Sequence, residues 1–95
     1  MSVVIISENT ALHNGQDGCI FVCDAALTIT IPNDTTSEFQ IGDQLSIFNR
    51  SAGTITLSAE AGVVLESPQN SITTQYGCAI LTKIANNEWI AMGTF

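Results

Sequence analysis

Positive charge is the scarcest feature of this sequence. Its 95 residues include two cations, Arg50 and Lys83, against nine acidic residues, and the net charge is −7. Nucleic-acid backbones are held by clustered Lys and Arg, and anionic membrane surfaces attract the same residues. The sequence therefore predicts no nucleic-acid partner and no membrane partner. The acids are spread along the chain without a run, which is typical of a solvated acidic surface.

Long apolar runs are also missing. No segment approaches the roughly 18 apolar residues that a membrane-spanning helix needs. The apolar run Val3–Ile6 is too short for the core of a signal peptide, and no cation precedes it. Apolar residues do not recur at helical spacing, and only residues 35–39 fit one helical turn. We expect a protein made in a cytoplasm, or built into a particle there.

Metal-ligating side chains are few and badly spaced. Cys19 and Cys23 lie four residues apart in an expected strand, which separates their Cα atoms by roughly 13 Å, too far for a disulfide. With Cys78 and His13 as the remaining candidates, four zinc ligands are not brought together in the sequence. We expect three reduced cysteines that pack as small hydrophobes, with no metal and no cofactor.

Catalytic patterns are absent as well. The single histidine, His13, stands in an Asn-Gly loop rather than beside a nucleophile. Asp24, at a strand end, is the one acid near an apolar stretch that could raise its pKa. Asp34 and Asp43 flank a loop but lack the ligand spacing of a calcium site. The sequence predicts no catalytic residues, and the protein is not expected to be an enzyme.

The main positive feature of the sequence is the alternation of apolar and polar side chains in several segments. The chain is 45% hydrophobic and 12% charged, a balance typical of a folded globule. Leu27–Ile31 and residues 54–58 alternate aliphatic side chains with Thr and Ser, which predicts half-buried strands. Val3–Ile6 and residues 19–23 are continuous apolar runs instead. Such runs fit strands covered on both faces, by a second sheet or by a neighbouring subunit.

Turn signals separate further expected strands. Residues 49–53 predict a hairpin turn, and Asn86-Asn87 predicts a two-residue hairpin, because Asn tolerates positive φ. The other expected strands cover residues 44–49, 62–65, 71–74, 78–84 and 88–93, and Trp89 is the expected core anchor. We predict one all-β domain over residues 1–95, a small antiparallel β-sandwich (jelly-roll-like) or a compact barrel of eight or nine short strands. Residues 1–18 are expected to form an N-terminal arm or edge strand.

The polar surface is built mainly from hydroxyls and amides. The chain has 19 Ser and Thr residues and 12 Asn and Gln residues, so exposed strand faces should carry little charge. Such faces suit packing against other β subunits. Strand edges are usually protected by Lys, and this chain has one Lys in total. We therefore expect its edges to be covered inside an oligomer or a larger particle.

From about residue 27 to the C-terminus, the sequence resembles small β modules in virion proteins of tailed bacteriophages. The segments that carry the resemblance are TITIP at 28–32, FQIGDQLSI at 39–47, GTITL at 53–57, GVVL at 62–65, QYGCAIL at 75–81 and NEWIAMG at 87–93. Modules of this kind occur in tail fibres and in head decoration or head-fibre proteins. The resemblance implies a β-rich, non-enzymatic and commonly homotrimeric protein.

Within that class, the short chain and its negative charge favour a capsid decoration (cement) protein. Such a protein binds the major capsid protein on the outer surface of the assembled capsid, away from packaged DNA, and stabilises the shell. A free-standing module would have to bind through its own surface. We expect the capsid or intersubunit contact to involve the N-terminal run, as an added edge strand: Val3, Val4, Ile5 and Ile6.

The alternative is a tail- or head-fibre module that binds a host receptor or a glycan. Sugar sites favour exposed aromatic rings. Most of the six aromatic residues lie in expected strands and are assigned to the core. Phe39 and Tyr76 are the exceptions, and they are the expected ligand contacts under this alternative.

Overall fold

A computed structural model describes residues 2–95 and contains strands, turns and no helix in that range. It accordingly holds no helix with the length and apolar character that a membrane crossing needs. The strands are β1 (Val3–Ile6), β2 (Thr10–Ala11), β3 (Ile20–Cys23), β4 (Leu27–Ile31), β5 (Gln44–Asn49), β6 (Ile55–Ala59), β7 (Val64–Glu66), β8 (Ser71–Ile72), β9 (Cys78–Ala85) and β10 (Glu88–Thr94). The all-β prediction is confirmed. Nine of these strands overlap expected ones, and the two-residue β2 was not predicted.

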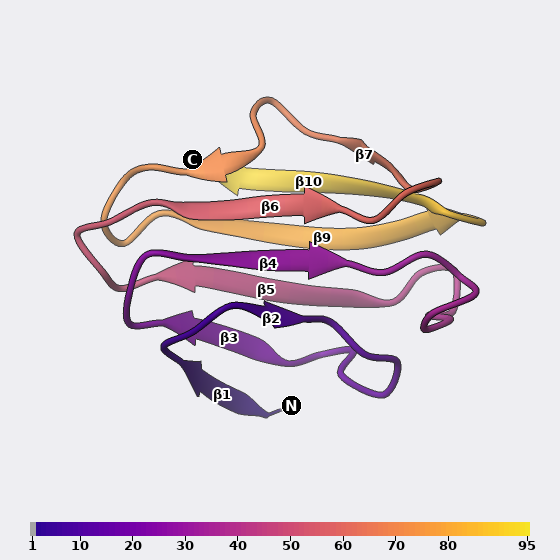
Figure 1. Cartoon of the computed structure of the whole chain (residues 1–95), viewed down its shortest axis with the longest axis horizontal. Helices are drawn as coiled ribbons and strands as arrows, with labels where there is room; N and C mark the ends of the chain where they lie inside the picture. The colour runs from indigo at the N-terminus through magenta and orange to yellow at the C-terminus, as the bar shows by residue number, and fades with distance from the viewer. Residues whose placement is uncertain (1) are drawn as a thin grey trace.

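The chain alternates between two sheets. One sheet has six strands in the order β1-β3-β5-β9-β10-β7, and the other has four in the order β2-β4-β6-β8. Figure 1 shows the four-stranded sheet in front of the six-stranded one, with β1 and the N-terminus at one border of the molecule. Each of the first connections therefore carries the chain from one sheet to the other.

This winding makes much of the structure parallel, so the prediction of an antiparallel arrangement is wrong for it. β1, β3 and β5 pair in parallel, as do β2, β4 and β6. Two crossings return the chain to its starting sheet in the same direction, and neighbours in that sheet then run parallel. Antiparallel pairing begins where β8 joins β6 in the four-stranded sheet. In the six-stranded sheet it begins where β9 joins β5, and the chain then folds back as β10. Both sheets are thus mixed.

The segment 49–53 is a crossing between the sheets and not the predicted hairpin turn. β5 and β6 flank it, and they belong to different sheets. The buried amide of Asn49 fixes this crossing, because its Nδ2 donates hydrogen bonds to the carbonyls of Gly53, Ile72 and Thr74. A turn signal marks a reversal of the chain, but it does not decide whether the next strand pairs with the last one.

Two other local expectations have clear outcomes. Residues 35–39 form no helix; a single turn closes where the Ser37 amide donates to the Asn33 carbonyl over 3.0 Å. The hairpin turn at Asn86-Asn87 is confirmed between β9 and β10, with Asn87 at a φ of 55°. The register shifts at Glu88 and Trp89, which is the bulge that follows a left-handed residue in such hairpins.

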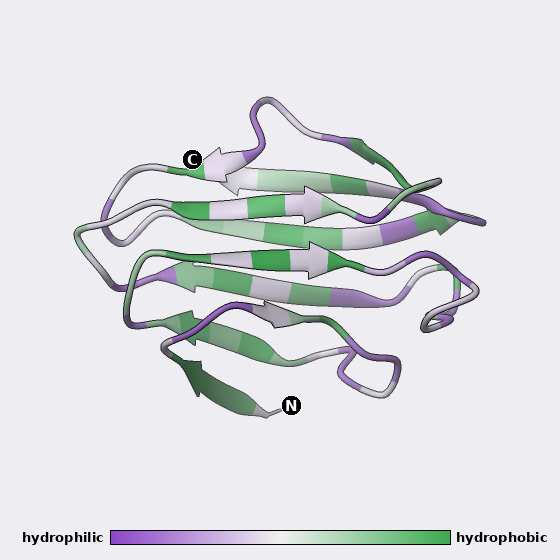
Figure 2. Cartoon of the chain, viewed as in Figure 1, coloured by the Kyte–Doolittle hydropathy of each residue, from purple (hydrophilic) through white to green (hydrophobic). Residues whose placement is uncertain are grey.

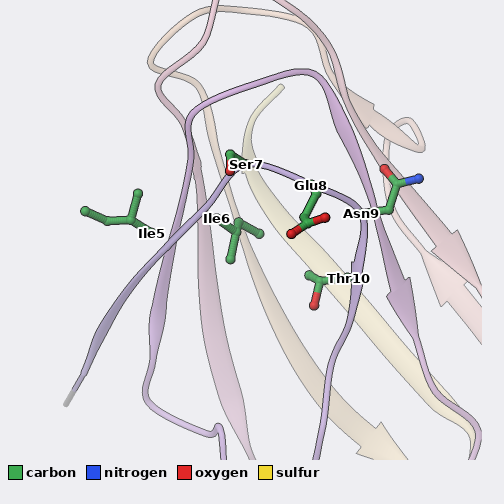
Figure 3. A pocket seen from close by; sticks show the side chains of 6 residues that line it. All are labelled: Ile5, Ile6, Ser7, Glu8, Asn9 and Thr10. Carbon is green, nitrogen blue, oxygen red and sulfur yellow. The ribbon is translucent and has the colours of Figure 1, made fainter.

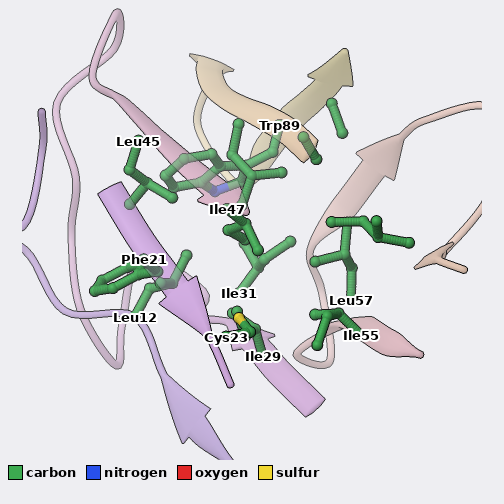
Figure 4. Close-up of a cluster of buried hydrophobic side chains, with 14 of the residues drawn as sticks. Leu12, Phe21, Cys23, Ile29, Ile31, Leu45, Ile47, Ile55, Leu57 and Trp89 are labelled. Atoms are coloured by element: carbon green, nitrogen blue, oxygen red, sulfur yellow. The ribbon is translucent and has the colours of Figure 1, made fainter. Parts of the chain in front are cut away.

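The inward side chains of both sheets form one core. Figure 2 shows β4 and β6 alternating between apolar and polar residues along the strand. Figure 4 shows how their apolar side chains meet those of the other sheet in a single cluster: Ile29, Ile31, Ile55, Leu57, Ile47 and Trp89. Trp89 is buried as predicted, and its ring packs edge-on against Phe39 with centroids 5.1 Å apart. This core fixes which strand faces turn outward.

Candidate association surface

The outer face of the six-stranded sheet carries a row of apolar side chains across five strands. The strand register places Val3 beside Ile20, Ile20 beside Ser46, Ser46 beside Ile80, and Ile80 beside Met92. Val3, Met92 and Ile80 are 65%, 50% and 39% exposed. Four of the five side chains in this row are therefore apolar, and the three largest exposures belong to apolar residues.

A second row runs beside the first, two residues away from it on each strand. Here the register aligns Ile5, Val22, Phe48, Cys78 and Thr94. The ring of Tyr76 stacks on Phe48 with centroids 6.2 Å apart and extends this row at the end of the sheet. Neither row contains a charged side chain. We call the apolar side chains of the two rows the apolar face: Val3, Ile5, Ile20, Val22, Phe48, Cys78, Ile80 and Met92.

The opposite outer surface has different chemistry. The outward positions of β4, β6 and β8 in the four-stranded sheet are hydroxyl side chains: Thr28, Thr30, Thr56, Ser58 and Ser71. Such residues are easily solvated, whereas the largest contiguous apolar patch on a protein surface often has a function. The asymmetry between the two outer surfaces singles out the apolar face as the candidate site.

The predicted contact residues Val3, Val4, Ile5 and Ile6 form β1, the edge strand of this sheet. The alternation of the strand divides them. Val3 and Ile5 point outward and belong to the apolar face, while Val4 and Ile6 are half-buried and pack against the core. Residues 2–18 also supply Leu12, which is fully buried in that core. Met1 lies outside the described residues.

A cavity of about 320 Å³ opens where the chain leaves β1 and crosses to β2. Its walls are Ile5, Ile6, Ser7, Glu8, Asn9 and Thr10. Figure 3 shows Ile5 and Ile6 directed to opposite sides of the chain, with the Glu8 carboxylate near Ile6 and Thr10. The end of the edge strand therefore carries a hollow with an exposed negative charge beside it.

The two expected glycan contacts have different environments. Phe39 is 2% exposed, so the expectation that it stands outside the core is wrong, and its ring is closed to a ligand on the surface. It is held there by its packing on Trp89 and by the Lys83 ammonium, which binds its carbonyl oxygen. Tyr76 is 65% exposed. It has a φ of 67°, which is rare for a bulky residue, and its amide donates to the Asn49 carbonyl over 2.6 Å.

Both cations of the chain are engaged in ion pairs. Lys83 is 1% exposed, and its Nζ lies 2.6 Å from Asp34 Oδ1 and 2.6 Å from the Phe39 carbonyl oxygen. It lies at a second cavity of about 370 Å³, which Glu38, Gln40, Ile41 and Asn86 also line. Arg50 binds Asp24 with two hydrogen bonds of 2.6 and 2.8 Å. Both side chains are therefore already paired with a carboxylate.

The candidate acids and thiols take part in structural contacts. Hydrogen bonds from Arg50 hold the pKa of the Asp24 carboxyl below its usual range, so the acid at the strand end is ionised and paired. Burial, assisted by the Asp24 charge, raises the pKa of the Cys23 thiol to about 11. Cys23 is fully buried, while Cys19 and Cys78 are half-buried, and all three are free. Among residues 2–95, no three metal-ligating side chains are grouped to hold an ion.

One sequence signal indicated part of the apolar face, and the other contributions to it were not predicted. The continuous apolar runs at residues 3–6 and 19–23 indicated strands covered on both faces, and these strands contribute Val3, Ile5, Ile20 and Val22 to it. The contributions of β9 and β10 were not predicted, because outward Ile80 and Met92 emerge only from the register. No protein-family model matches the chain, and no curated protein is significantly similar to it.

Proposed function

We propose that this protein is a non-enzymatic structural module of a bacteriophage virion. In this role it forms a homotrimer and decorates the outer surface of the assembled capsid, bound to the major capsid protein. The observation that carries the proposal is the apolar face, which occupies the position where a solitary soluble domain would expose polar side chains. The same two layers of strands over one core support a β-sandwich as the class of fold.

The apolar face covers part of the area that a stable protein–protein interface needs. With strands about 4.8 Å apart and residues rising about 3.3 Å each, its two rows and their borders span roughly 400–500 Å². A standard protein–protein interface buries about 800 Å² on each partner. The face therefore supplies about half of one such interface, and the adjoining β1 edge and Tyr76 lie where the rest would come from.

The proposed mechanism is thermodynamic. A protein that binds only the assembled, expanded shell stabilises that state by linkage, to an extent set by its concentration relative to the dissociation constant. Three equivalent contacts in a trimer would combine modest individual affinities into strong attachment. The net charge of −7 suits a position on the outside of the shell, because contact with packaged DNA would be repulsive.

The first test is the native mass of the purified protein, measured by light scattering after size exclusion. A mass of three times the 10.1 kDa of one chain is expected. The second test mixes the protein with expanded capsids and with unexpanded precursor capsids of the parent phage, followed by sedimentation. Selective sedimentation with expanded capsids, and a higher capsid melting temperature, are the expected results. A monomer that sediments with neither particle would refute the proposal.

Tyr76 favours the fibre module as the second candidate function. Its ring is exposed on a strained backbone and stacks on a second aromatic ring, an arrangement that suits contact with a receptor or glycan. Under this proposal, Tyr76→Ala would reduce host adsorption at least several-fold, while Phe39→Ala would act through loss of folding. Unchanged adsorption with Tyr76→Ala would remove this candidate.

A further inference from the structure

We propose that the open edge of β1 binds a β-strand of a partner protein that carries Lys or Arg beside its apolar residues. The inference rests on the proposed function, because it names the chemistry of the partner segment in the assembly. It is supported by three features of the described residues: the backbone groups of β1, the character of the other sheet edges, and the distribution of charge.

Two residues of β1 direct their backbone groups away from the sheet. The carbonyl oxygen of Ser2 accepts a hydrogen bond from Ile20, and that of Ile6 accepts one from Asp24, over 2.8 and 2.9 Å. Even-numbered residues thus face β3. Because successive residues of a strand direct their backbone groups to opposite sides, the N–H and C=O groups of Val3 and Ile5 face the free edge. They form a template for one more strand.

The other three sheet edges are shorter than β1. β2 and β8 have two residues each, and β7 has three, with Pro68 two residues after its end. Short strands and Pro are common protections against edge pairing. β1 has four residues, all Val or Ile, and carries neither Lys nor Pro. It is the edge on which an added strand would gain most backbone hydrogen bonds.

The negative charge of this chain indicates which kind of partner strand would bind to the edge of β1. Glu8 lies in the hollow at the end of β1, and the chain as a whole carries −7. A second copy of this chain could not neutralise Glu8 with its Lys or Arg side chain without breaking an ion pair, because Arg50 is bound to Asp24 and Lys83 to Asp34. A basic partner strand meets both requirements, with backbone pairing along Val3 and Ile5 and a cation near Glu8.

The experiment uses the full chain, labelled with nitrogen-15, and three eight-residue peptides. The first alternates Thr and Val and has Lys at both ends; the second has Glu in place of Lys; the third copies residues 2–9 of this chain. Binding is measured by fluorescence anisotropy, and amide exchange by NMR. The basic peptide is expected to bind at least about tenfold more tightly than the acidic one and to slow exchange at the Val3 and Ile5 amides.

Two matched variants separate backbone pairing from side-chain contact. Ile5→Pro removes an outward N–H without removing a hydrogen bond to β3, and it should weaken the basic peptide at least about tenfold. Ile5→Thr keeps that N–H and a β-branched side chain, and it should change the affinity no more than about threefold.

A third variant tests the role of charge: Glu8→Gln should bring the affinities of the basic and acidic peptides close together. Circular dichroism and thermal unfolding check that each variant is folded.

Three results would overturn the inference: no binding of the basic peptide, unchanged exchange at Val3 and Ile5 on binding, or tighter binding of the peptide that copies residues 2–9. The last result would assign the edge to a second copy of this chain. These failures are distinguishable from failure of the proposed function. A protein that is trimeric and binds expanded capsids but ignores the basic peptide would retain its proposed function and lose only this assignment of the edge.

Discussion

Lys83 shows how one side chain couples distant segments of this small core. It lies on β9, yet its ammonium reaches Asp34 and the carbonyl of Phe39 in the loop that follows β4. The Asp34 carboxylate also accepts a hydrogen bond from the Asn87 amide at the β9–β10 turn. One buried ion pair therefore holds the long loop between β4 and β5 against the hairpin.

We predict that Asp34→Ala destabilises the protein by about 3 kcal/mol, because it leaves the buried Lys83 ammonium without its counter-charge. Lys83→Met should cost less, since it fills a similar volume and leaves the partly exposed Asp34 near solvent. Urea unfolding of both variants measures the two costs. The double variant is the control, and it should be more stable than Asp34→Ala alone. Equal effects of the two single changes would contradict this account.

Among the glycines, Gly93 is the one at which an added Cβ would come closest to a neighbouring backbone atom. Its φ is 150°, and an added Cβ would overlap the carbonyl oxygen of Cys78 on the adjacent strand. We predict that Gly93→Ala destabilises the protein by at least about 3 kcal/mol, through backbone strain and displacement of β10 from β9. Gly62→Ala is the matched control, because Gly62 also has a positive φ but has open space around it. It should cost about 1–2 kcal/mol in the same unfolding measurement.

At the scale of elements, the connections carry specific polar contacts that hold the two sheets together. Glu60 follows β6 and accepts hydrogen bonds from the Asn33 amide and the Thr36 hydroxyl, in the loop after β4. The Glu60 amide in turn donates to the carbonyl of Ile31 at the end of β4. The ends of two neighbouring parallel strands are thereby joined through one residue.

These contacts predict a pH dependence of stability. Two hydrogen bonds, the first from the Thr36 hydroxyl and the second from the Asn33 amide, lower the pKa of the Glu60 carboxyl below its usual range. A lowered pKa in the folded state contributes stability above the unfolded pKa, and this contribution is lost as the pH falls through the folded pKa. Glu60→Gln should therefore reduce the free energy of unfolding more at pH 6 than at pH 3.

The measurement is urea unfolding of the wild type and of Glu60→Gln at both pH values. Glu66→Gln is the control, since it makes the same change of charge on the exposed edge strand β7. Its effect should be small at both pH values. A Glu60→Gln effect that is equal at pH 6 and pH 3 would show that the carboxylate form is not preferred by these contacts.

At the scale of the whole molecule, the two outer surfaces differ in chemistry. The molecule measures 33 × 26 × 19 Å, and one broad side is covered with hydroxyls while the other presents the apolar face. In a molecule this small, the apolar face is a large share of one side. Exposing this apolar area to water is unfavourable, and covering it with another apolar surface removes that cost.

We predict that Ile80→Lys converts the proposed trimer to single chains, because burying an unpaired ammonium in an apolar interface costs at least about 2 kcal/mol. Ile80 is partly exposed in the single chain, so the fold should tolerate the change. Thr56→Lys makes the same type of change on the hydroxyl side and should leave the native mass unaltered. Light scattering after size exclusion compares the two variants. Dissociation by both or by neither would contradict a role for the apolar face.

The positions of the strands and the chemistry of their side chains can be predicted from the amino-acid sequence alone. Alternation at Leu27–Ile31 and at residues 54–58 located β4 and β6 within a residue, and Asn86-Asn87 located the hairpin turn. These features are local, because side chains on one strand alternate between its two faces whatever the strand pairs with. The scarcity of cations is likewise visible in the sequence without knowledge of the fold.

The pairing of the strands, the exposure of their faces and the burial of polar groups could be seen only in the folded structure. The parallel register that aligns Val3 with Ile20 and Ser46 joins segments far apart in the chain, and nothing local encodes it. Burial of Phe39 and Lys83 follows from the loop that folds over β9 and β10. Pairing and burial depend on contacts between distant segments, so the apolar face became visible only when the register aligned its rows.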